Sequence, residues 1–105
     1  MVDWHLYVVQ TVESFLYAGI STDPQRRFEE HLAQGRKAAK YLIAHKPLRL
    51  AFSQAIGDRV LALKVEHHFK RLPREAKERI LHSGELHFDG DSGKILFPGP
   101  GSIDS

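Results

Sequence analysis

Two tyrosines, an Arg–His pair and one helical glutamate are the side chains of this sequence that could take part in chemistry. Arg27 and His31 are four residues apart, so on a helix they share a face that could bind a phosphate and move a proton. Glu66 lies near the apolar side of an expected helix, where a carboxylate is costly unless it is paired or binds a cation. Simpler alternatives stay open: Arg27 and His31 could form a solvated face, and Glu66 could pair with Lys70 at i+4.

Other chemistries are disfavoured by the sequence. There is no cysteine, and the adjacent His67 and His68 would point in different directions on a helix, which argues against a zinc site. No glycine-rich nucleotide loop and no Gly-x-Ser-x-Gly motif is found. A hard divalent cation, Mg²⁺ or Mn²⁺, is the metal that a lone carboxylate would suit.

Two strands are expected to carry the tyrosines. Residues 4–10 and 15–20 are rich in aromatic and β-branched residues, and the link between them is short enough for an antiparallel hairpin. Tyr7 lies in the first of these strands and Tyr17 in the second. Tyrosines in such a hairpin are ordinarily core or edge residues.

The Arg–His pair lies in an expected helix over residues 24–34. Asp23 can cap its N-terminus, Pro24 is tolerated in the first turn, and Phe28 and Leu32 are expected to face the core. The basic segment 36–46 that follows has no pattern that assigns it a structure.

The second half predicts one more strand and two more helices. Residues 47–55 alternate, so Leu48, Leu50 and Phe52 are expected on one face of a third strand. Helices are expected from Asp58 to Leu72 and from Arg74 to His82. The fold class is therefore α+β, with a small three-stranded antiparallel sheet flanked by about three helices.

The chain of 105 residues allows one domain, expected over residues 1–83. Residues 84–105 form a C-terminal extension, expected to be a hairpin followed by a disordered end from Pro98. Hydrophobic residues make up 42% and charged residues 27%, and no apolar run is long enough to span a bilayer. With no secretory signal and no cysteine, we expect a cytoplasmic protein with no membrane partner.

Positive charge is concentrated in the middle of the chain. Residues 24–82 hold 14 of the 15 Lys and Arg residues against six acids, whereas both ends are acidic. This distribution suggests a polyanionic partner, most often nucleic acid, and a plain solvated basic surface stays open as the alternative.

In order and spacing, these features resemble the GIY-YIG endonuclease domain over roughly residues 3–82. The segments that carry the resemblance are His5-Leu6-Tyr7, Tyr17-Ala18-Gly19, the run from Ile20 to His31, Ala39-Lys40-Tyr41, Pro47-Leu48-Arg49-Leu50, Ala62-Leu63-Lys64-Val65-Glu66 and the run from Lys70 to Lys77. His5-Leu6 stands where the family has Gly-Ile, and Ala18 where it has Ile. The segment Tyr17 to His31 is similar to the small, single-domain bacterial branch.

The resemblance implies a catalytic role for each of the five residues. Tyr7 would be the general base or its relay, Tyr17 would lie at the same centre, and Arg27 would stabilise charge on the phosphate. His31 would assist proton transfer, and Glu66 would be the sole protein ligand of a single Mg²⁺ or Mn²⁺. Arg27 and the cation are expected to lower the pKa of a catalytic tyrosine. A basic track would follow the DNA backbone: Arg26, Lys37, Lys40, Lys46 and Arg49.

The resemblance thus implies a divalent-metal-dependent DNA endonuclease, selective for DNA structure rather than sequence, in repair or recombination. One site cutting two strands would favour a homodimer or sequential nicking. Two alternatives stay open: a non-catalytic nucleic-acid-binding module on the same fold, and a small protein that binds an acidic partner.

Overall fold

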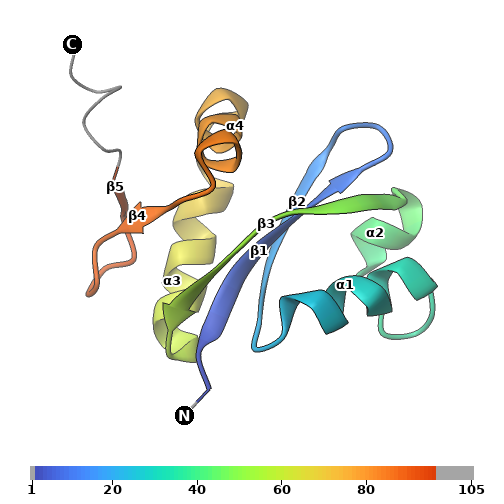
Figure 1. The fold of residues 1–105 in the computed structure, drawn as a ribbon, viewed down its shortest axis with the longest axis horizontal. Coiled ribbons are helices and arrows are strands. Elements are labelled where there is room, and N and C mark those ends of the chain that lie inside the picture. Colours follow the sequence, from blue (N-terminus) through green and yellow to red (C-terminus); the bar gives the residue numbers. More distant parts are fainter. Residues whose placement is uncertain (1, 97–105) are drawn as a thin grey trace.

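A three-stranded antiparallel sheet in the order β2-β1-β3 forms the centre of the protein (Figure 1). The computed structural model describes residues 2–96. In chain order its elements are β1 (Trp4–Thr11), β2 (Leu16–Ser21), α1 (Pro24–Ala33), α2 (Lys40–Ala44), β3 (Pro47–Gly57), α3 (Arg59–Lys70), α4 (Arg74–Ser83), β4 (His87–Phe88) and β5 (Ile95–Leu96). None of the helices in this described part has the length and apolarity needed to cross a membrane.

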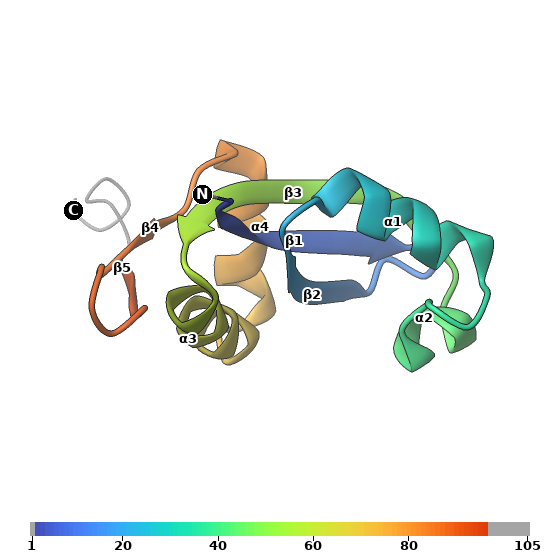
Figure 2. The same cartoon turned by 90° about the horizontal axis from the view of Figure 1, so that it is seen from below.

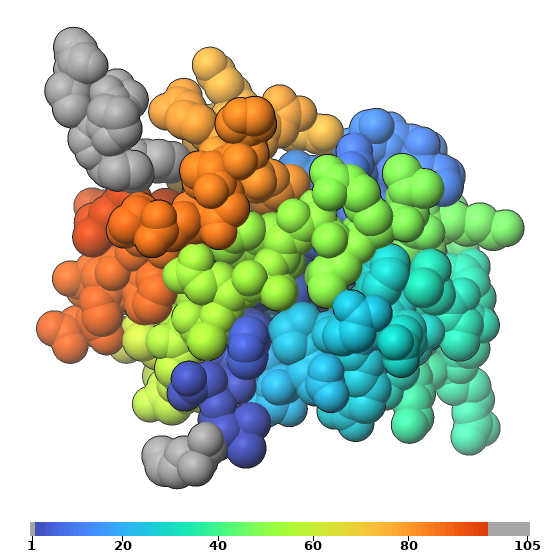
Figure 3. All heavy atoms as spheres, viewed as in Figure 1, coloured from blue at the N-terminus to red at the C-terminus, as the bar shows by residue number. Residues whose placement is uncertain are grey.

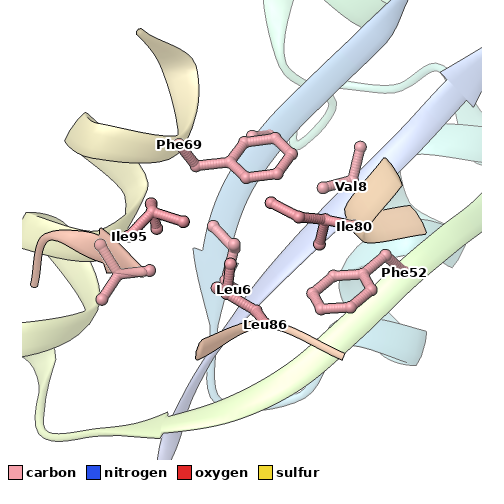
Figure 4. Packing of buried hydrophobic residues seen from close by; sticks show 9 residues of the cluster. Leu6, Val8, Phe52, Phe69, Ile80, Leu86 and Ile95 are labelled. Carbon is pink, nitrogen blue, oxygen red and sulfur yellow. The ribbon is translucent and has the colours of Figure 1, made fainter. Parts of the chain in front are cut away.

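The central strand β1 is buried on both of its faces, which is why its sequence is almost continuously apolar. Because successive side chains alternate, Leu6 and Val8 pack on one face and Tyr7 and Val9 on the other. The first face is covered by α3, α4 and the C-terminal hairpin, whose apolar side chains meet those of the sheet (Figure 4). The second face is covered by α1 and α2, which lie at the opposite end of the molecule from α3 and α4 (Figure 2).

The α+β class and the three-stranded antiparallel sheet are confirmed. The helix count differs, because the structure has a short additional helix, α2, in the basic segment that the sequence left unassigned. Leu32 of α1 is 47% exposed, so its assignment to the core is wrong. The buried residue of that helix beside Phe28 is His31, and its burial is important for the site described below.

The expected shared face of the third strand is also wrong. Phe52 packs with α3 and α4, whereas Leu50 packs with the tyrosine face, and Leu48 is 56% exposed. The reason is a break in the pairing of β1 with β3: Val8 is opposite Phe52, but Val9 is opposite Leu50. A bulge of this kind inserts one residue and turns the following side chains to the other face.

Beyond α4, the chain returns to the core through the antiparallel pair β4–β5. Leu86 and Ile95 are buried in the same cluster as the α3 side chains. Gly93, at φ +73°, packs so closely that an added Cβ would lie 2.8 Å from the Val65 nitrogen of α3. The hairpin therefore extends the domain core, while the end expected from Pro98 lies outside the described residues.

Candidate active site

The ring of Tyr7 lies across the backbone of the edge strand β2. The register of β1 and β2 places Tyr7 opposite Gly19. A Cβ added at Gly19 would lie 2.6 Å from the Tyr7 hydroxyl oxygen and 2.8 Å from the ring carbon that bears it. Glycine is therefore needed at position 19 because the Tyr7 hydroxyl occupies the space that any side chain would fill.

Replacing Gly19 by alanine is expected to displace the Tyr7 hydroxyl and to lower the free energy of unfolding by about 1–3 kcal/mol, because the buried ring has to move. Urea unfolding measures the loss. Gly90→Ala is the matched control, since no atom lies within 4 Å of a Cβ added there. Equal stability of the two variants would contradict the close packing of Tyr7 on Gly19.

His31 holds the Tyr7 hydroxyl from α1. Its side chain is completely buried, and its Nε2 lies 3.0 Å from the Tyr7 hydroxyl oxygen. Its Nδ1 accepts a hydrogen bond of 3.2 Å from the backbone N–H of Ala39. Since a backbone N–H can only donate, Nδ1 carries no proton, and in the neutral ring the proton is on Nε2. His31 therefore donates its Nε2–H to the Tyr7 oxygen.

Burial keeps both members of this pair neutral near pH 7. It lowers the pKa of His31 from 6.5 to about 4, and the charge of Arg27 acts in the same direction. The pKa of Tyr7 is raised to about 12, mainly by burial; the charges of Tyr17 and Glu66 act in the same direction, whereas Arg27 acts against them. Arg27 thus acts in the expected direction, but by itself it does not outweigh the effect of burial.

The low pKa of His31 predicts that the free energy of unfolding decreases as the pH is lowered below about 6.5. In the unfolded state the histidine has a pKa near 6.5 and binds a proton below that pH. In the folded state His31 binds this proton only near pH 4, because its pKa is about 4. Between pH 6.5 and 4.5, the free energy of unfolding of wild type should decrease by about 2 kcal/mol more than that of His31→Gln, which has no histidine to titrate at this position. Urea unfolding at the two pH values measures this difference. Parallel losses in both proteins would show that His31 titrates normally.

Arg27 is fixed beside this pair on the same helix. Its Nη1 donates to the Glu30 carboxylate at 2.9 Å and also to the backbone carbonyl of Lys37. The side chain is 30% exposed and its charge acts on Tyr7, so a guanidinium lies at the border between the buried pair and solvent. This is a suitable position for a group that neutralises a phosphate.

Tyr17 joins the buried pair from β2. Its ring centroid lies 6.5 Å from that of Tyr7 and 5.8 Å from that of His31. The structure therefore brings four of the five expected residues together on the face of the sheet that α1 covers.

Glu66 comes from α3, on the other face of the sheet, yet its charge reaches Tyr7. Tyr7 lies over the edge strand β2 at Gly19, and α3 also packs against β2. The Glu66 side chain is 17% exposed and forms an ion pair of 2.9 Å with Lys70, which is the simpler alternative raised by the sequence.

The residues at this edge fit a single hard cation better than a zinc ion. Within residues 2–96, no three His, Cys, Asp or Glu side chains gather as a ligand set. Mg²⁺ commonly takes one or two carboxylates and completes its shell with water and phosphate oxygens. Glu66 supplies one carboxylate of this kind, and its side chain is 17% exposed.

The expected basic track is divided between two faces. Lys37, Lys40 and Lys46 are exposed on the segment between α1 and β3. Arg26 is exposed on α1, 3.8 Å from the Asp23 carboxylate. Arg49 donates to Gln10 at 2.7 Å and lines a pocket with α4 residues, on the face away from Tyr7.

Two contributors to the site were not found from the sequence. The Ala39 N–H sets the tautomer of His31, and no sequence pattern reports a backbone donor. Gly19 belongs to the tyrosine motif, but its contact with the Tyr7 hydroxyl depends on the strand register.

The sheet, the paired tyrosines and the Arg–His helix lie within a stretch of the chain that matches a known family of catalytic domains. Residues 3–79 match the GIY-YIG catalytic domain, and the chain belongs to this nuclease family. The chain is 45% identical to the UPF0213 protein of Citrobacter koseri over 85 residues, 81% of this chain and 83% of the relative. It is 44% identical to the UPF0213 protein YhbQ of Escherichia coli O8 over 84 residues, 80% of this chain and 82% of the relative. No solved structure matches the chain.

Proposed function

We propose that this protein is a divalent-metal-dependent endonuclease that hydrolyses phosphodiester bonds in DNA. The observation that carries the proposal is the buried Tyr7–His31 hydrogen bond beside Arg27, with the charge of Glu66 acting on the same tyrosine. Phosphodiester hydrolysis needs an activated water, neutralised phosphate charge and a stabilised leaving oxygen. This constellation offers a group for each of the first two needs.

In the proposed reaction the phenolate form of Tyr7 accepts the proton of the attacking water and becomes the neutral phenol. Because His31 donates its Nε2–H to the Tyr7 oxygen, the same bond stabilises the phenolate and fixes its orientation. His31 is then a positioning residue, since its Nδ1 is occupied by the Ala39 N–H. Arg27 stabilises the negative charge that develops on the phosphate. A cation held by Glu66 would supply positive charge that favours the phenolate, the phosphate and the leaving oxygen.

The proposed selectivity is for DNA structure. No groove-reading element with base-contacting side chains is evident in the described residues, whereas exposed lysines are available for the phosphate backbone. Contacts of this kind give salt-dependent affinity with little sequence information. Shape and deformability of the DNA would then decide where it is cut.

A non-catalytic nucleic-acid-binding module is the second candidate. The Glu66–Lys70 ion pair favours it, because a carboxylate with a stable partner does not require a metal ion. Such a module would hold DNA through the same lysines without cutting it.

Cleavage of labelled DNA separates the two candidates. Single-stranded, duplex, nicked and branched substrates are incubated with Mg²⁺ or Mn²⁺ and with wild type or Arg27→Ala. An endonuclease cuts at least one substrate, and Arg27→Ala slows it by about 10²–10³-fold, the usual cost of losing one donor to a developing charge. Salt-sensitive binding by wild type without any cutting would establish the binding module instead.

A further inference from the structure

A line of stacked rings leads from the buried tyrosines to the surface. The Tyr41 ring of α2 stacks on Tyr17, with centroids 5.8 Å apart and planes inclined by 21°. His45 follows at 4.6 Å from Tyr41, and Phe15 lies 5.1 Å from His45. We refer to Tyr17, Tyr41, His45 and Phe15 as the aromatic ladder. Its inner end touches the candidate active site, because Tyr17 packs against both Tyr7 and His31.

The outer end of the ladder is open to solvent. Tyr41 is 40% exposed and Phe15 is 42% exposed, so both residues remain accessible to a ligand. Single exposed apolar residues are common on proteins and need no explanation. Four rings in mutual contact that continue a catalytic pair form a connected surface, and connected aromatic surfaces commonly bind ligands with flat faces.

The charge around the ladder indicates what that ligand is. Residues 31–48 contain no acidic residue and four basic ones: Arg36, Lys37, Lys40 and Lys46. One acid contacts the ladder from the β1–β2 turn: the Glu13 carboxylate lies 3.1 Å from the His45 Nδ1. Lys37 and Lys40 precede Tyr41, and Lys46 follows His45 directly; all three are exposed. The segment between α1 and β3, residues 34–46, forms one end of the molecule, at the right edge in Figure 3. Flat rings bordered by cations are complementary to bases joined by phosphates.

We propose that the aromatic ladder stacks on unpaired bases that flank the phosphate to be cut. A base pair inside a duplex presents only its edges, so a ring such as Tyr41 can stack only on a base that is free of its partner. The preferred substrate is therefore DNA with a single-stranded segment at the cutting position. This inference rests on the proposed function, since it names the substrate class of the same site.

Binding in the presence of EDTA tests the ladder without any cutting. Fluorescence anisotropy compares a labelled strand of about 12 nucleotides with its blunt duplex, a length matched to single-strand sites of about 4–16 nucleotides. Tyr41→Ala is expected to weaken binding of the single strand about tenfold and to leave duplex binding unchanged. Tyr41→Trp, which keeps a stacking ring, is expected to bind as wild type. Val60→Ala, at a residue 62% exposed on α3, controls for loss of a surface apolar group.

Three results would overturn the ladder proposal. These are equal weakening on single strand and duplex, no weakening at all, and failure of Tyr41→Trp to restore affinity while it remains folded. Sedimentation tests whether a second copy of the chain binds this face instead. A wild-type dimer that Tyr41→Ala converts to a monomer would show that the ladder is an interface between two copies.

Adding Mg²⁺ to the same samples separates this proposal from the nuclease itself. Selective loss of single-strand binding in Tyr41→Ala without cutting by wild type would uphold the ladder and reject the nuclease. Cutting of duplex and single strand alike, unaffected by Tyr41→Ala, would uphold the nuclease and reject the ladder. The same strand made as RNA runs alongside, and a larger effect of Tyr41→Ala on RNA would identify RNA as the unpaired strand.

Discussion

Tyr7→Phe is expected to cut DNA about 10²–10⁴-fold more slowly than wild type, the range typical for loss of a general base. The substitution removes the oxygen that His31 holds at 3.0 Å and leaves the ring on Gly19 in place. Single-turnover cleavage of a labelled strand measures the loss, with circular dichroism to confirm folding. Tyr17→Phe is run beside it, and a larger loss for Tyr17→Phe would reverse the roles given to the two tyrosines.

The pH dependence of the wild-type rate checks the same assignment. Because burial raises the pKa of Tyr7 to about 12, its phenolate form is scarce at pH 7 and increases about tenfold per pH unit. The cleavage rate should therefore rise with pH through the neutral range until a bound cation or another step limits it. A rate that is flat or falls above pH 6 would exclude Tyr7 as the base.

Glu66→Gln is expected to reduce Mg²⁺-dependent cleavage by about 10²–10³-fold, since metal stabilisation of the transition state amounts to several kcal/mol. The amide keeps the shape of the side chain but removes the charge that a hard cation requires. The matched control is Glu78→Gln on α4, which breaks a comparable i,i+4 ion pair, to Arg74, outside the site.

Lys70→Met separates the metal role of Glu66 from its ion pair. This substitution removes the partner at 2.9 Å but keeps the carboxylate. If Glu66 binds the cation, Lys70→Met cleaves within a few fold of the wild-type rate and requires no higher Mg²⁺ concentration than wild type. If Lys70→Met and Glu66→Gln lose activity to the same extent, the ion pair itself is what matters.

Local signals in the sequence were sufficient to predict the main elements. Asp23 and Pro24 mark the start of α1 correctly because the cap is a local interaction: the Asp23 side chain accepts from the Arg26 N–H. The first two strands are recognisable because aromatic and β-branched residues are concentrated there. The short helix α2 escaped prediction because five residues carry no usable periodicity.

Features that depend on tertiary packing were not predictable. Sequence spacing placed Leu32 in the core of α1, whereas the fold buries His31, because Tyr7 and the Ala39 N–H satisfy both ring nitrogens. The opposite facing of Leu50 and Phe52 results from a bulge between β1 and β3, which only the pairing of the two strands reveals.

The site was predictable as a set of residues but not as a mechanism. Spacing placed Arg27 and His31 on one helix and marked Glu66 as a carboxylate in an unfavourable position. The direction of the His31–Tyr7 hydrogen bond depends on a backbone donor eight residues beyond His31. The net rise of the Tyr7 pKa depends on burial, which exceeds the effect of Arg27.

The most direct test of the central claim is a time course of cleavage of single-stranded and branched DNA, with Mg²⁺ and after addition of EDTA. The double variant Tyr7→Phe/Glu66→Gln, purified in the same way, serves as the blank for contaminating nucleases. We predict that wild type cuts at least one substrate only when the cation is present, and that the double variant cuts none. Equal cutting by both proteins, or binding without cutting by wild type, would contradict the assignment of a nuclease active site to Tyr7, His31, Arg27 and Glu66.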